Sequence, residues 1–294
     1  MITLLDDEET TRKLGKDGRG IDVSESVNRV VNALQAKQSG VVEIPTLTIA
    51  STTEYKRTYS PSRALQNQLA QIVAKRSGRW GVSVVELGGL GRSSSYNGSQ
   101  RFVTASTYKL FVAYLILEKV EAGQLSNYSV LGNGVSVSEC LSDMIVYSDN
   151  ACAIALAQNI GWDSIDEMLH ARGFSNTNLD NYNSYGALAG DKQSTANDEA
   201  NFLKRLQNGT LLEPANTQLL LGLMARQVYR LGVPSGVPGI RVSDKVGFLE
   251  GYLHDAAIVY SPKRPYVIVV LTYNSSWSQI AQATKEINAY LEAE

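Results

Sequence analysis

The order of strand-like and helical segments constrains the fold of this chain most. From about residue 62 a helical pattern and the strand-like run "GVSVVEL" are followed by a mostly helical region over residues 104 to 225. Three apolar, strand-like runs then come before a closing helical pattern: "RVSDKVGFLEG", "HDAAIVYS" and "YVIVVLTY". Strands at both ends with helices between them predict an α/β fold of the α+β type, in which a mixed sheet lies beside an all-helical lobe. We expect a cleft between the two.

The first sixty residues follow a different pattern. Residues 24 to 37 have helical spacing of apolar residues behind a serine that can cap the helix, and "GVVEIPTLTIA" follows as a strand-like run. The stretch "STTEYKRTYSPSR" is polar and contains a proline, which is typical of a linker. We therefore predict a small N-terminal α/β segment over residues 1–50, a linker over 51–61 and the main domain over 62–294.

Composition narrows the class of partner. The chain of 294 residues is 44 % hydrophobic and has 27 basic and 29 acidic residues without a block of like charge, so nothing favours nucleic acid or an anionic membrane surface. A small molecule or a peptide is the expected substrate. The start lacks the basic and apolar pattern of a signal peptide, so a leader or membrane anchor would belong to a segment absent here. We expect Cys140 and Cys152 to be two buried thiols.

The motif "TASTYKLFVAYL" places a hydroxyl and an amine on one face of an apolar helix. Ser106 and Lys109 are three residues apart, which is one helical turn. A partly desolvated lysine can take the proton of a serine, and the helix N-terminus stabilises a developing oxyanion. The pair therefore fits acyl transfer. Taken alone, the motif is equally what a surface serine and a surface lysine would give.

Two further motifs carry groups of the same kind. In "MIVYSDN", Ser148 and Asn150 can present a hydroxyl and a carboxamide to a cleft, although S-D-N is also a common turn and helix cap. In "SDKVGFLEG", Lys245 offers charge for a substrate carboxylate, Gly247 permits close approach, and the N–H of Phe248 can point at a carbonyl oxygen. Neither motif is specific by itself.

The three motifs in this order resemble those of the penicillin-recognising serine enzymes. The sequence looks like that of a class A serine β-lactamase or a related cell-wall enzyme over about residues 62–294, and the flanking stretches "EKVEAGQL", "VSVSECLSDMIVYSDNACAIAL" and "STANDEANFLKRL" agree. The resemblance implies a β-lactamase-like fold with a mainly antiparallel sheet. It also implies the roles of five residues: the nucleophile Ser106, its base Lys109, the proton relay Ser148, the substrate-orienting Asn150 and the carboxylate-binding Lys245.

The resemblance implies an oxyanion hole as well, made by the backbone N–H groups of Ser106 and Phe248, with Gly247 on the same strand. Two other residues are expected to contact the substrate carboxylate. His254 lies at a strand position where some relatives carry an arginine, and Arg230 precedes "LGVPSG". A structural ion pair is an equally good interpretation of Arg230.

Three departures from the family pattern bear on activity. The glutamate that activates the deacylating water in the family aligns with Asn183, and a carboxamide cannot accept a proton at neutral pH. Val246 replaces a residue with a hydroxyl. Only 42 positions separate Ser106 from Ser148, fewer than in the family, which favours a more open cleft.

The sequence thus predicts a serine hydrolase that forms an acyl-enzyme with β-lactams or D-Ala-D-Ala-type cell-wall peptides and deacylates slowly. It is expected to be extracytoplasmic, monomeric, and independent of metal or organic cofactor, because the covalent step is internal. Two alternatives stay open. One is a surface peptidoglycan-binding module with a vestigial enzyme lobe, favoured by the N-terminal segment's resemblance to such modules; the other is a glutaminase-like or esterase member of the fold.

Overall fold

A computed structural model describes the chain apart from a few short segments and one longer one. The residues outside it are 1, 6–7, 14–17, 22, 38–39, 50–53, 57–59, 89, 180–191 and 294. The chain divides into two compact units, 1–58 and 59–294.

The smaller unit contains short antiparallel strands and one helix. Its elements are β1 (Ile2–Leu5), β2 (Glu8–Lys13), β3 (Gly18–Ile21), α1 (Val23–Gln35), β4 (Thr46–Ile49) and β5 (Glu54–Lys56). The predicted helix is confirmed, but the apolar residues at its helical spacing are exposed, including Leu34 at 73 %. The strand predicted in "GVVEIPTLTIA" is limited to β4. Strand β5 pairs with β2, so part of the predicted linker is a strand.

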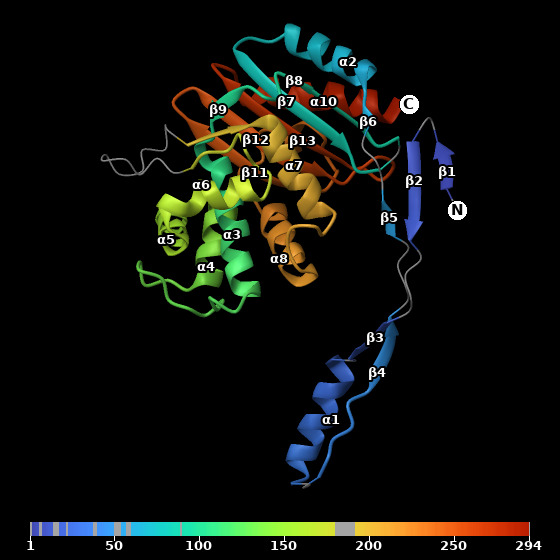
Figure 1. Cartoon of the computed structure of the whole chain (residues 1–294), viewed down its shortest axis with the longest axis vertical. Coiled ribbons are helices and arrows are strands. Elements are labelled where there is room, and N and C mark those ends of the chain that lie inside the picture. The colour runs from blue at the N-terminus through green and yellow to red at the C-terminus, as the bar shows by residue number, and fades with distance from the viewer. Residues whose placement is uncertain are drawn as a thin grey trace. The chain divides into compact units, whose positions relative to one another are not determined.

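The larger unit is built on one six-stranded sheet (Figure 1). Its strands lie in the order β11 (Val242–Leu249), β12 (Tyr252–Val259), β13 (Tyr266–Tyr273), β7 (Arg79–Glu86), β8 (Arg92–Tyr96) and β6 (Ser60–Pro61). All pairs are antiparallel except β6 with β8. Strands from both ends of the region therefore share one mainly antiparallel sheet, as predicted.

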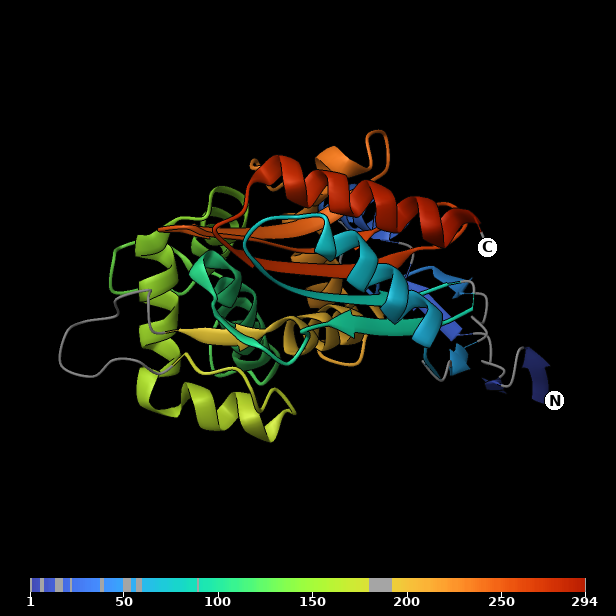
Figure 2. The same cartoon turned by 90° about the horizontal axis from the view of Figure 1, so that it is seen from above.

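Both faces of this sheet are covered, which explains its continuously apolar strands. On β13, Val267, Val269 and Leu271 face the core of the helical lobe. The alternate residues Ile268 and Val270 face a second core under helices α2 (Arg63–Ala74) and α10 (Trp277–Ala293). Because successive side chains of a strand point to opposite faces, burial on both faces requires an unbroken apolar run. Figure 2 shows α2 and α10 lying along the sheet.

The helical lobe surrounds one buried helix, α3 (Lys109–Glu121). The other helices of this region are α4 (Val137–Ser142), a π-helical turn (Asp143–Tyr147), α5 (Asn150–Ile160), α6 (Trp162–Ala171), α7 (Ala196–Gln207) and α8 (Pro214–Ala225). Every residue of α3 from Leu110 to Leu117 is at most 2 % exposed. A helix buried on all sides must be apolar all round, which explains the sequence "LFVAYLIL".

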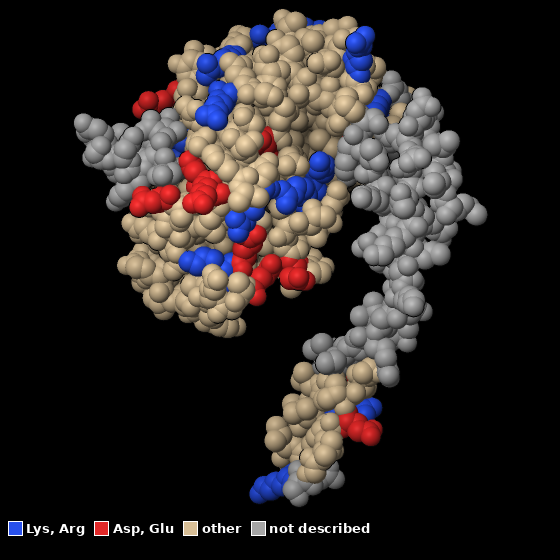
Figure 3. Space-filling view, viewed as in Figure 1, with Lys and Arg blue, Asp and Glu red and all other residues tan. Residues whose placement is uncertain are grey.

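Three small elements complete this unit. Strand β9 (Arg101–Val103) pairs with β10 (Gln193–Thr195), and the short helix α9 (Val233–Gly236) precedes β11. On the face shown in Figure 3, basic and acidic side chains are both present among uncharged ones. Among the described residues, no helix is both long and apolar enough to cross a membrane.

Candidate active site

Ser106 lies on a tight turn that leads into α3. Residues Ala105–Tyr108 form a 3-10 turn, and Ala105 has a φ of 45°, which is unusual for a residue with a side chain. Thr104 and Thr107 are fully buried on either side, whereas Ser106 is partly exposed. A strained, well-packed turn of this kind holds one side chain in a fixed direction. The expected nucleophile is thus accessible on a rigid support.

Lys109 lies one turn further on and is fully buried. Its Nζ donates to three acceptors on the Ser148–Asn150 turn: the Ser148 carbonyl oxygen at 2.6 Å, Ser148 Oγ at 3.3 Å and Asn150 Oδ1 at 2.7 Å. Burial lowers the pKa of Lys109 to about 8, and the nearby Asp149 carboxylate opposes this shift. A substantial fraction of this amine is therefore neutral near pH 8 and able to accept a proton.

The S-D-N turn serves as both a helix cap and a source of cleft groups. Asp149 is the N-cap of α5, and its carboxylate accepts from Cys152 N at 2.7 Å. Ser148 has a φ of 62°, in the left-handed region, directly after the π-helical turn. This backbone conformation directs the Ser148 side chain and the Asn150 carboxamide towards Lys109. The motif is therefore both a helix cap, through Asp149, and a source of polar groups for the site, through Ser148 and Asn150.

Lys245 approaches the same hydroxyl from β11. Its Nζ donates to Ser148 Oγ at 3.0 Å and to the Val246 carbonyl oxygen at 2.8 Å. Burial, together with the positive charge of Lys109, lowers the pKa of Lys245 to about 7. Ser148 Oγ thus lies between two buried amines whose charged forms disfavour each other. Such a hydroxyl is well placed to pass a proton between groups in the cleft.

Gly247 lets β11 approach the nucleophile turn. A Cβ at this position would lie 2.8 Å from the Thr104 carbonyl oxygen and 3.0 Å from Ser106 N. Both neighbours are backbone atoms that cannot move aside, so a side chain would push the strand away. Ser106 and Phe248 both line a pocket of about 180 Å³ between the lobe and the sheet, with Asn150, Trp162 and Lys192. The predicted cleft is therefore present, and the expected nucleophile lies in it.

The sequence matches the profile of the family described as "Beta-lactamase enzyme family" over residues 64–291. The chain belongs to the β-lactamase enzyme family. The β-lactamase of Bacillus amyloliquefaciens is 28 % identical over 253 residues, which are 76 % of this chain and 81 % of that protein.

Solved structures of other proteins share the fold. An ancestral class A β-lactamase is 28 % identical with a TM-score of 0.66, over 78 % of this chain and 100 % of the other. A PBP-A variant, solved as an acyl-enzyme complex with penicillin G, is 21 % identical with a TM-score of 0.73, over 80 % and 98 % of the two chains. The predicted β-lactamase-like fold is therefore confirmed.

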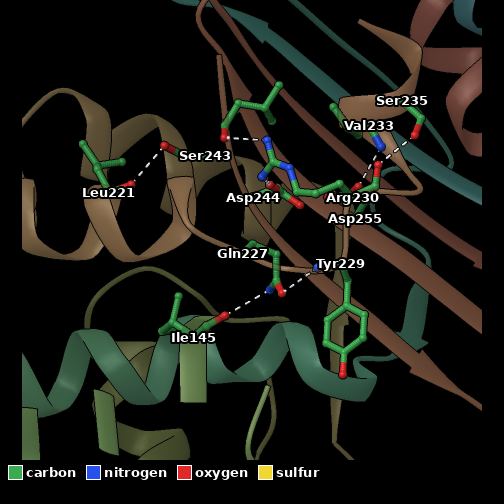
Figure 4. A network of polar contacts seen from close by, with 11 residues as sticks. Ile145, Leu221, Gln227, Tyr229, Arg230, Val233, Ser235, Ser243, Asp244 and Asp255 are labelled. Carbon is green, nitrogen blue, oxygen red and sulfur yellow. Dashed lines mark hydrogen bonds and ion pairs between the residues drawn. The ribbon is translucent and has the colours of Figure 1, made fainter. Parts of the chain in front are cut away.

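In this member of the β-lactamase family, Arg230 forms a structural ion pair, which is the second of the two interpretations given for it. Its guanidinium pairs with the buried Asp244 and donates to the Val242 carbonyl oxygen at 3.2 Å (Figure 4). Asp255, also buried, accepts from Val233 N at 2.7 Å beside this pair. The geometry therefore gives Arg230 a role in holding β11 and the segment before α9, and does not support the predicted contact with substrate.

His254 does not reach the cleft surface either. It is fully buried, its Nε2 lies 2.6 Å from the Val103 carbonyl oxygen, and its Nδ1 accepts from Thr272 N at 3.0 Å. Burial lowers the pKa of His254 to about 4, so the ring is neutral near pH 7. Both ring nitrogens bind backbone groups, so the predicted contact with a substrate carboxylate is not supported. Asn183 lies outside the described residues.

The two cysteines form a disulfide, so the prediction of two free thiols was wrong. Cys140 on α4 and Cys152 on α5 have Cα atoms 4.8 Å apart and are bonded. The 12-residue separation brackets the turn that carries Ser148 and Asn150. Because the bond ties both flanking helices together, it restrains this part of the candidate site.

Replacing both cysteines by alanine is expected to lower the free energy of unfolding by about 3 kcal/mol, because the unfolded chain regains loop entropy. Urea unfolding of the purified protein measures this loss. Reducing agent should lower the stability of the native chain by a similar amount and leave the double variant unchanged. Equal stability of the native chain and the double variant without reductant would contradict a stabilising bond.

Two buried charged residues near Ser106 were not singled out from the sequence. Lys192 lines the Ser106 pocket, with its Nζ 4.5 Å from the centre of the Trp162 ring and 5.6 Å from that of Tyr108. Glu199 on α7 is fully buried and accepts from Thr107 Oγ1 at 2.7 Å. Burial raises the pKa of Glu199 to about 8. Both residues lie in a polar part of the sequence, where nothing indicates that a charged side chain is buried.

No metal site was predicted for this chain. Among the residues that the structure describes, no group of three or more His, Cys, Asp or Glu is arranged to hold a metal ion. The chemical groups of the candidate site are instead a hydroxyl on a strained turn, two buried amines and a second hydroxyl between them.

Proposed function

We propose that this chain is a serine hydrolase of the β-lactamase type that forms an acyl-enzyme at Ser106. The observation that carries the proposal is the hydrogen-bonded chain from Lys109 through Ser148 to Lys245 beside an accessible serine. Its acyl donors are β-lactams or D-Ala-D-Ala-type cell-wall peptides. Membership of the family supports this reaction, as does a neighbour of the same fold that holds penicillin G as an acyl-enzyme.

In the proposed reaction, Lys109 in its neutral form takes the proton of Ser106 as Oγ attacks the acyl carbonyl. The backbone N–H groups of Ser106 and Phe248 stabilise the oxyanion. As the carbon–nitrogen bond of the donor breaks, Ser148 Oγ gives its proton to the leaving nitrogen and is replenished from Lys109. Asn150 orients the substrate amide, and Lys245 attracts its carboxylate.

Water then releases the acyl group, and we propose that this step is slow. In the resemblance to class A enzymes, Asn183 takes the place of the glutamate that activates this water. A carboxamide cannot serve as a base, so the acyl-enzyme should persist. The disulfide supports an extracytoplasmic location, where such bonds endure.

Intact-protein mass spectrometry after brief exposure to penicillin G tests the proposal. We expect one adduct of the mass of the penicillin that persists for hours and is absent in Ser106→Ala. Rapid release of hydrolysed penicillin without a lasting adduct would contradict slow deacylation and leave the serine hydrolase intact. Neither adduct nor product would contradict the proposed function and favour the surface-binding alternative.

A further inference from the structure

An apolar pocket adjoins the Ser106 pocket along β11. Its volume is about 140 Å³, and it is lined by Tyr229, Leu231, Val246, Phe248 and Trp277. None of these five side chains carries a charge at neutral pH. Phe248 also lines the pocket that contains Ser106, so the two hollows share a wall.

Large apolar side chains stay exposed around this pocket. Leu231 is 62 % exposed, Phe248 46 % and Tyr229 40 %, and the rings of Tyr229 and Phe248 meet edge to face with centroids 5.3 Å apart. Exposed apolar residues that gather beside an active-site pocket mark a surface that a ligand covers. The aromatic pair gives this surface a fixed shape.

Residues 229–231 precede β11. Tyr229 and Leu231 line the pocket, whereas the charged Arg230 between them does not. Figure 4 shows Arg230 directed towards Asp244, whereas the ring of the neighbouring Tyr229 points away from that pair. The Arg230 guanidinium already binds Asp244 and the Val242 carbonyl oxygen within the protein. Val246 contributes a hydrocarbon surface on the next strand. Among the described residues that line it, the pocket therefore has no cation and no pair of hydroxyls suited to a carboxylate.

The same segment is tied to the part of the chain that carries Ser148. Gln227 Nε2 donates to the Ile145 carbonyl oxygen at 3.0 Å, and Val228 N donates to that of Val146 at 3.2 Å. On the other side, the Val246 carbonyl oxygen accepts from Lys245 Nζ, which also contacts Ser148 Oγ. Val246, which lines the pocket, is thus linked through the Lys245 amine to Ser148, the proposed proton donor to the leaving group.

We infer that this pocket is a subsite for an uncharged hydrocarbon substituent on the leaving part of the acyl donor. The inference rests on the proposed function and adds the substrate class at that site. The substituent is covered by Tyr229, Leu231 and Phe248 while the acyl carbonyl lies at Ser106. A charged substituent would lose its hydration there without gaining a partner, so it is disfavoured.

Three thioester acyl donors that share the same phenylacetylglycyl acyl group test the inference. Their leaving thiols are mercaptoacetate, 2-mercapto-4-methylpentanoate and mercaptosuccinate, which add no side chain, an isobutyl group and a second carboxylate respectively. Ser106 Oγ forms the new ester bond, the carbon–sulfur bond breaks, and the serine proton balances the released thiolate. A thiol-reactive dye follows release of the thiol and so measures the second-order rate constant of acylation by each donor.

We expect the isobutyl donor to react roughly ten-fold faster than the unsubstituted one, and the succinate donor more slowly than either. Leu231→Asn should bring the first ratio close to one. Leu219→Asn is the matched control, because Leu219 is an exposed leucine of α8 that does not line the pocket. It should leave the ratio unchanged.

The outcomes separate this inference from the function on which it rests. Thiol release that depends on Ser106 but shows no isobutyl preference, or prefers mercaptosuccinate, would overturn the subsite alone. An isobutyl preference that survives Leu231→Asn would also overturn it. No release from any donor that depends on Ser106, together with no penicillin adduct, would overturn the proposed function and the subsite with it.

Discussion

Replacing Lys109 by methionine is expected to slow acylation of Ser106 by about 10²–10⁴-fold, the usual contribution of a general base. Methionine approximates the length of the lysine side chain, so the buried space stays filled. It has no amine to accept the serine proton, and it leaves the acceptors of the Ser148–Asn150 turn without their donor. Stopped-flow acylation by a chromogenic β-lactam, or quenched intact-mass analysis, measures the rate.

The pH dependence identifies the role of the amine. Since burial lowers the pKa of Lys109 to about 8 and the base is the neutral form, the acylation rate of the native chain should rise as pH increases through about 8. Lys119→Met, which changes a half-buried lysine at the far end of α3 that is bound to Asn159, should keep the native rate and profile. Native-like acylation by Lys109→Met would refute the assignment of Lys109 as base.

Glu199→Gln is expected to stabilise the protein at pH 8 and above. Burial raises the pKa of Glu199 to about 8, and its Oε2 has no hydrogen-bond partner among the described residues. The native state therefore keeps a proton that the unfolded state loses above about pH 4.5. Between about pH 4.5 and 8, each pH unit lowers the free energy of unfolding by about 1.4 kcal/mol. The total loss over this interval is up to about 5 kcal/mol.

The glutamine variant lacks this titration, so its advantage over the native chain should be small at pH 4, grow through this interval and level off above pH 8. Urea unfolding at a series of pH values measures the difference. Glu139→Gln, at an exposed position of α4, is the matched control and should show no comparable growth. A constant difference between pH 4 and 9 would show that Glu199 is ionised in the folded protein.

Much of the fold follows from patterns that are local in the sequence. The run "YVIVVLTY" predicts a strand because burial on both faces demands continuous apolar residues, and "LFVAYLIL" is the helix that the lobe surrounds. The positions of Ser106, Lys109, Ser148 and Lys245 could be anticipated because each motif constrains a short backbone segment. The approach of Lys109 and Lys245 to the Ser148 hydroxyl follows from the order of the motifs in a known type of fold.

Other features depend on contacts that a sequence does not reveal. The disulfide requires α4 and α5 to bring two Cα atoms within 4.8 Å, which residue spacing alone does not determine. The ion pair of Arg230 depends on a partner 14 residues away on β11. Glu199 appears in a polar stretch, "STANDEANFLKRL", and only the packing of α7 against the nucleophile turn buries it.

The central claim is that Ser106 is the residue acylated. Trypsin releases residues 102–109, "FVTASTYK", as one peptide after penicillin treatment. Fragmentation of this peptide in a tandem mass spectrometer should place the penicillin-derived group on Ser106, with the peptide unmodified in Ser106→Ala. A group found on Thr104, Thr107 or another peptide, or an adduct that persists in Ser106→Ala, would contradict the account.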